Sequence, residues 1–238
     1  MDGIPSESQY ARNIVIDLEF TPVAADHRIH GLKNEIIEIG AVKLGPNGEF
    51  CGEFSHLVAP QYADCVNWFV KDLTSLTNYD VYNAEELSDV VFQLKEWIGP
   101  IPARMITWSR TDKYQLTKEC QAKRIPTEGL PKTWIDIQPL YPPLMGLDRD
   151  VVSLADAAEW YDCHDPNGRE HHALSDARIT AELLARLMNG TLAECPSAAE
   201  VRKRLGMEAA ATDKKAVAAK KLRLLSAKLK AQEAFGSA

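Results

Sequence analysis

The chain has 238 residues, of which 45% are apolar, and a net charge of −7. This length buries one sizeable core plus an appendage but excludes two full domains. No apolar run of about 18 residues occurs, and the first thirty residues lack the basic, apolar and small-residue order of a signal peptide. We therefore expect a soluble cytoplasmic protein with no membrane partner.

Positive charge is concentrated at the C-terminus. Residues 201–238 contain ten Lys or Arg but three Asp or Glu, and one helical face there would carry Ala218, Leu222, Leu225 and Leu229. We predict a domain over residues 1–195 and a basic Ala/Lys/Leu-rich helical tail over 196–238. The tail could bind a nucleic-acid strand, dock on a partner protein, associate with its own copy or be a solvated extension.

The first half of the chain predicts an antiparallel meander. Apolar runs over 13–20, 36–44 and 50–58 are typical of strands, and Gly45-Pro46-Asn47-Gly48 has the composition of a turn. The segment from Thr21 to Asn34 is expected to be a polar loop. It contains His27 and His30, which lack further zinc ligands nearby and are therefore assigned to solvent.

Strands and helices alternate further along the chain. We expect helices at 84–98, 111–123, 153–161 and 174–188, and strands at 104–108 and 133–137. A meander followed by this alternation predicts an α/β fold with a mixed sheet covered by helices. In such folds, ligand sites favour the carboxyl ends of the parallel strands.

Two carboxylates end the first predicted strand. Because side chains two residues apart point to the same face of a strand, Asp17 and Glu19 should converge. Beside an apolar run this convergence is costly unless a cation compensates, and Mg²⁺ or Mn²⁺ prefers oxygen ligands. The alternative is a solvated strand end.

A second group of polar residues surrounds the start of the last predicted helix. His171 precedes this helix and Asp176 lies in its early turns. An imidazole titrates near neutrality and suits general-base work, while Asp176 can complete a ligand set with Asp17 and Glu19. Taken singly, a helix cap and a surface charge are the alternatives.

The Asp-x-Glu pair and His171-His172-Ala173-Leu174-Ser175-Asp176-Ala177 together resemble the DEDDh (DnaQ-like) 3′-to-5′ exonuclease family. Asn34 to Val42 resembles the second strand of that family, and Asp72 to Thr77 its usual Leu-Thr-Gly-Ile-Thr. The resemblance covers about residues 12–190. It implies a ribonuclease H-like mixed five-stranded sheet, with strands one to three antiparallel and strands four and five parallel, flanked by helices.

The resemblance also implies roles for individual residues. The family carries an Asp in the first turn of a helix after its fourth strand, and Asp112 fits by order and spacing. Asp17 would bridge two divalent ions, Mg²⁺ or Mn²⁺, with Glu19 and Asp176 on the nucleophile side and Asp112 supporting the other ion. Glu19 is thus both a metal ligand and part of the catalytic set with His171, the base. His172 is assigned to packing or surface.

Residues near these motifs are predicted to contact the substrate. They are Phe20, Thr21 and Trp108; the two aromatic rings could stack on a terminal base, with core packing as the alternative. The family usually has Gly at the position of Ser75 and, in proofreading members, Thr at that of Phe20. Asp17-Leu18-Glu19-Phe20-Thr21 is closer to the histone-mRNA and small-RNA trimming branch and to sporulation-inhibitor relatives, which favours RNA.

The sequence therefore predicts an exonuclease that releases nucleoside monophosphates from single-stranded RNA or DNA 3′ ends by two-metal-ion hydrolysis. Two alternatives stay open. One is a module that binds nucleic acid or a partner without cutting. The other is a proofreading subunit whose tail docks on a polymerase.

Overall fold

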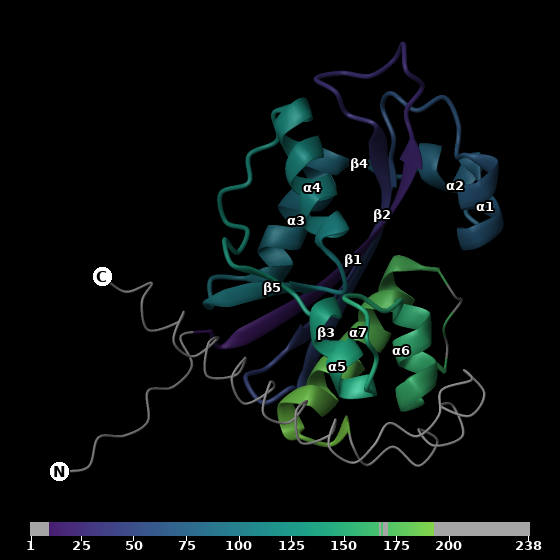
Figure 1. Ribbon diagram of the computed structural model, residues 1–238. Helices are drawn as coiled ribbons and strands as arrows, with labels where there is room; N and C mark the ends of the chain where they lie inside the picture. The colour runs from purple at the N-terminus through teal and green to yellow at the C-terminus, as the bar shows by residue number, and fades with distance from the viewer. Residues whose placement is uncertain (1–9, 167, 169–170, 193–238) are drawn as a thin grey trace.

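The computed structural model describes residues 10–166, 168, 171 and 172, and the chain from there to residue 192. A twisted sheet crosses the middle of the molecule with helices on both faces (Figure 1). The predicted boundary at residue 195 and the predicted tail over 196–238 lie outside the described residues. Within the described residues, no helix is long and apolar enough to cross a membrane.

The sheet has six strands in the order β4-β3-β2-β1-β5-β6. β1 (Arg12–Pro22), β2 (Asn34–Leu44) and β3 (Phe50–Ala59) form the expected antiparallel meander. β5 (Ala103–Thr107) and β6 (Trp134–Asp136) extend the sheet in parallel beyond β1. The predicted α/β fold with its mixed sheet is confirmed, with a two-residue sixth strand, β4 (Glu85–Glu86), added parallel to β3.

Two hydrophobic layers cover the two faces of the sheet. Ile14, Ile16 and Leu18 of β1 pack with α3 (Leu87–Ile98) and α4 (Arg110–Lys123). Val15 faces the opposite layer, which contains α5 (Tyr141–Met145), α6 (Leu154–Tyr161) and α7 (Ala173–Asn189). The strand period of two therefore divides β1 between two cores, and it directs Asp17 and Glu19 to the α7 side.

Local signals determine where the helices begin and end. The hydroxyl groups of Ser109 and Ser153 accept hydrogen bonds from the first-turn amides of α4 and α6, as N-caps do. Gly190 ends α7 in the left-handed conformation that glycine adopts most readily. These caps place the starts of α4 and α6 at the predicted positions.

The structure adds short helices that sequence periodicity did not predict. They are α1 (Trp68–Thr74), α2 (Asn78–Tyr82), the 3₁₀ turn η1 (Gln138–Leu140) and α5. Each has seven residues or fewer, which is too short for a helical repeat to stand out. α1 ends at Ser75, whose φ of 61° is left-handed, and this explains why glycine suits that position.

Candidate active site

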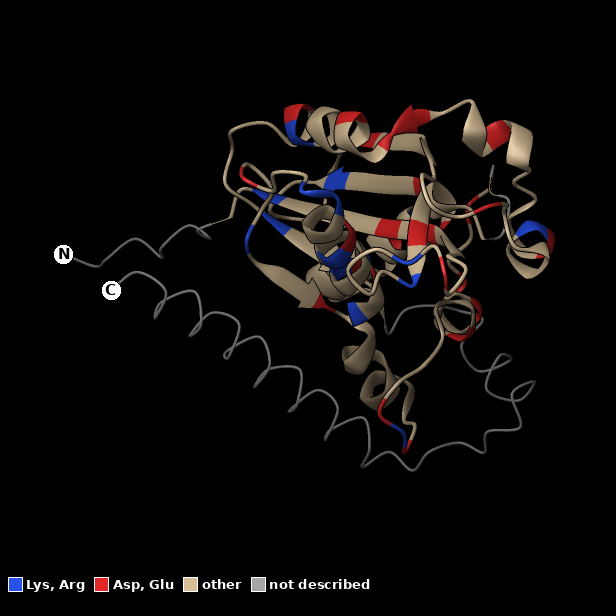
Figure 2. Ribbon diagram, turned by 90° about the horizontal axis from the view of Figure 1, so that it is seen from above, with Lys and Arg blue, Asp and Glu red and all other residues tan. Residues whose placement is uncertain are grey.

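The site is built on one face of the paired strands β1 and β2. Asp17 lies opposite Gly40, and Glu19 lies opposite Glu38. Acidic positions of neighbouring strands therefore lie side by side within the sheet (Figure 2). Glu38 is 4% exposed, so the face that receives Asp17 and Glu19 already carries a buried third carboxyl group.

The start of α7 lies directly on this face at Gly40. A Cβ atom added at Gly40 would be 2.1 Å from the carbonyl carbon of Ala173 and 2.1 Å from the amide nitrogen of Leu174. The close approach brings Asp176, in the first turn of α7, to the two strand carboxylates. Ligand oxygens of Asp17, Glu19 and Asp176 lie within 4.8 Å of one another.

Asp112 reaches the same site from α4, on the opposite side of the sheet from α7. Asp112 is 6% exposed; its own backbone amide, the amide of Leu18 and the Ser109 hydroxyl lower the pKa of its carboxyl group against the larger effect of burial. Besides burial, repulsion from Asp112 raises the pKa of both Asp17 and Glu19, so the carboxyl group of Asp112 lies near theirs.

The electrostatics of the site favour bound cations. Burial, followed by repulsion from Asp176, Glu38 and Asp112, raises the pKa of Glu19 to about 8. Burial raises the pKa of Asp112 to about 7. Burial and then the neighbouring carboxyl groups also raise the pKa of Asp17 well above its usual value. Converging oxygen ligands with too little compensating positive charge fit hard divalent ions such as Mg²⁺ or Mn²⁺.

The two histidines before α7 have different surroundings. His172 Nδ1 lies 3.4 Å from Glu38 Oε2, which also accepts a 3.2 Å hydrogen bond from the Ala173 amide. Glu38 therefore contacts both His172 and the start of α7. His171 is half-buried, and its φ of 59° lies in the left-handed region that non-glycine residues seldom adopt.

The three residues predicted to contact substrate have other contacts. Trp108 is 5% exposed, and its indole N–H donates to the carbonyl of Val152, as the core-packing alternative requires. Thr21 is buried, and its hydroxyl oxygen accepts a 3.0 Å hydrogen bond from the Asn67 amide in front of α1. Phe20 is partly buried against the core layer of α3 and α4.

Two residues of the site were not assigned from the sequence. Glu38 anchors α7. In the sequence, the feature that could have identified it is a single charged residue within the apolar run Ile36-Ile37-Glu38-Ile39. Ser109 caps α4, and its hydroxyl lowers the pKa of Asp112. In the sequence it is recognisable as a helix-capping residue immediately before α4.

Comparison with known proteins agrees with this geometry. The model of the RNase_T family, described as Exonuclease, matches residues 14–184. The chain belongs to this family. Membership implies divalent metal ions, in keeping with the donor set described above.

Individual relatives extend the comparison. The chain is 30% identical over 176 residues to ERI1 exoribonuclease 2 of Danio rerio, a match that covers 65% of this chain and 31% of that protein. It is 29% identical over 175 residues to the probable 3′-5′ exonuclease KapD of Bacillus subtilis, covering 74% of this chain and 83% of KapD. The chain spans only 25% to 31% of the length of the ERI1 exoribonuclease 2 relatives.

Solved structures show the same fold. The crystal structure of the nuclease domain of 3′hExo, a DEDDh family member bound to rAMP, matches with a TM-score of 0.65 and 23% identity. The match covers 78% of this chain and 95% of the 3′hExo domain. The expected ribonuclease H-like architecture of DEDDh nucleases is therefore confirmed.

Proposed function

We propose that this protein is a metal-dependent exonuclease that removes nucleoside monophosphates from the 3′ ends of single-stranded nucleic acid. The observation that carries the proposal is the convergence of Asp17, Glu19 and Asp176, with the buried Asp112 close enough to raise the pKa of both Asp17 and Glu19. Three separate elements supply these oxygens. Four clustered carboxyl groups are costly in a fold unless they hold cations.

Each residue has a definite task in this mechanism. By resemblance to the family, Asp17, Glu19 and Asp176 would hold the ion nearer the attacking water, and Asp17 and Asp112 would hold the second. When bound, the ions would activate the water and stabilise the departing oxygen. His171 accepts the proton of the attacking water. Glu38 keeps the start of α7, and hence Asp176, seated on the sheet.

We further propose that RNA is preferred over DNA. The Asp17-Leu18-Glu19-Phe20-Thr21 segment resembles the RNA-trimming branch of the family, and ERI1 exoribonuclease 2 is among the relatives. A module that binds without cutting would not require the full set of four carboxylates and a histidine, so the enzyme is the better supported reading. Docking on a polymerase would depend on the predicted tail, which lies outside the described residues.

Degradation of end-labelled strands tests the proposal. Matched single-stranded RNA and DNA, labelled at the 5′ end, are incubated with Mg²⁺ or Mn²⁺, with and without a chelator. We expect a ladder that shortens from the 3′ end, faster for RNA. Asp17→Asn should abolish the ladder, whereas Asp72→Asn, which removes an exposed carboxylate on α1, should not. Strand binding by the wild-type protein without shortening would support the non-cutting module.

A further inference from the structure

The solvent-facing side of α4 is positively charged although the chain as a whole carries −7. The two acidic residues of α4, Asp112 and Glu119, are both buried, at 6% and 0% exposed. The charged residues on the outer side of α4 and its C-cap are basic. Arg110, Lys113 and Arg124 are exposed, and Lys118 is partly buried. The acidic body therefore presents one cationic helix face.

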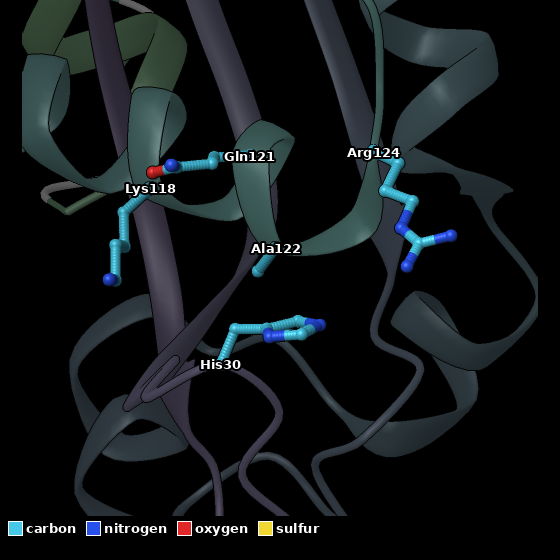
Figure 3. Close-up of a pocket in the computed structure, with 5 residues that line it drawn as sticks. All are labelled: His30, Lys118, Gln121, Ala122 and Arg124. Atoms are coloured by element: carbon cyan, nitrogen blue, oxygen red, sulfur yellow. The ribbon is translucent and has the colours of Figure 1, made fainter.

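A pocket opens at the C-terminal end of this face. It has a volume of about 270 Å³ and lies between the β1–β2 loop, which supplies His30, and the last turns of α4. Figure 3 shows the His30 ring below Ala122, with the Lys118 and Arg124 side chains on either side. A cavity of this size is near the lower end of small-ligand sites, so it suits one phosphate group rather than a protein segment.

The basic side chains of the pocket have no partner within the described part of the chain. No hydrogen bond or ion pair there involves the side chains of His30, Lys118 or Arg124. By contrast, Lys123 is buried and bonded to Glu35 and Glu119 at 2.6 and 2.8 Å. Lys118 and Arg124 are therefore available to an anion, and their removal should not disturb the fold.

The cationic face leads away from the carboxylate site. Thr111, Tyr114 and Lys118 are three and four residues apart, so they share one side of the helix. Lys118 lies six residues beyond Asp112, or about 9 Å along the helix axis, and Arg124 about 18 Å. Tyr114, between them and the site, is 66% exposed. An exposed aromatic ring followed by unpaired cations is the pattern of single-strand binding surfaces.

We propose that the α4 face from Tyr114 to Arg124, together with His30, binds the nucleic-acid strand a few nucleotides upstream of its 3′ end. Tyr114 stacks on a base, and Lys118 and Arg124 bind a backbone phosphate in the pocket. This inference rests on the proposed exonuclease function. The α4 face gives the strand a cationic contact on a body that is otherwise acidic. Because only a strand several nucleotides long reaches this contact, affinity should increase with substrate length.

Length-dependent and salt-dependent kinetics test the inference. Single-stranded RNA of twelve or three nucleotides, with the same 3′ sequence, is degraded by wild type, Lys118→Gln/Arg124→Gln and Tyr114→Ala. We expect the double variant to raise KM for the dodecanucleotide roughly tenfold and to reduce the slope of log(kcat/KM) against log[salt] by about 1.4. Tyr114→Ala should raise that KM roughly fivefold or more. Both effects should shrink for the trinucleotide, which does not reach the pocket.

Lys132→Gln, which removes an exposed lysine from the loop before β6, is the matched control and should leave the KM and the salt slope at wild-type values. Unfolding temperatures of all variants should match that of the wild type, so that a loss of folding is excluded. If wild type degrades the strand but the double variant has the same KM and salt slope as Lys132→Gln, the α4 binding surface is refuted and the exonuclease proposal stands. If wild type degrades no strand yet binding measured by anisotropy depends on Lys118 and Arg124, the surface stands and the exonuclease proposal fails.

Discussion

Replacing Gly40 by alanine is expected to move Asp176 of α7 away from Asp17 and Glu19 of β1. The added Cβ would lie 2.1 Å from backbone atoms of Ala173 and Leu174, about 1.3 Å short of the 3.4 Å at which ordinary contact begins. Backbone atoms cannot rotate away as a side chain can, so the start of α7 must retreat from β2. Asp176 would then move by about 1 Å relative to Asp17, a displacement that costs on the order of 100-fold in rate.

Steady-state degradation of a labelled strand measures this effect. Overpacking should also lower the free energy of unfolding by about 1–3 kcal/mol, so stability needs its own control. Gly190→Ala provides one: Gly190 has φ 72° and no neighbour within 4 Å, so alanine there adds backbone strain of about 1 kcal/mol far from the site. If Gly40→Ala keeps the wild-type kcat/KM, or if the two variants lose equal activity, then activity does not depend on the close contact between the start of α7 and Gly40 of β2.

Three further predictions concern pH, the histidines and the α1 cap. Because the folded-state pKa values of Glu19 (about 8) and Asp112 (about 7) exceed the unfolded values near 4, the folded state binds more protons between those limits. The unfolding temperature of the metal-free protein should therefore fall as pH rises from about 4 to 8, and a rise would contradict these shifts. His171→Ala should lower kcat by about 10²–10⁴-fold with metal-dependent substrate binding retained, and a larger loss in His172→Ala would reverse the assignment. Ser75→Gly should raise the free energy of unfolding by about 1 kcal/mol by relieving the left-handed backbone, measured by denaturant titration, with no change in kcat.

The amino-acid sequence by itself determined the periodic parts of the protein. Alternation along β1 places Asp17 and Glu19 on one face, because successive side chains of a strand point in opposite directions. The longer helices follow from their apolar repeat and from capping residues such as Ser153. The spacing of Asp176 within its motif places it in the first turn of α7. These features depend on neighbours within a few residues, which a sequence shows directly.

The tertiary structure alone decided which distant groups meet. Gly40 and Ala173 touch because the missing side chain of one admits the backbone of the other, and nothing local to either residue encodes that contact. Asp112 of α4 lies near Asp17 and Glu19 of β1, and Glu38 anchors a helix that begins 135 residues later in the chain. The indole of Trp108 is likewise buried by helices that follow it in the chain. Such contacts depend on how the layers pack, and a single sequence records their chemistry without recording which residues they join.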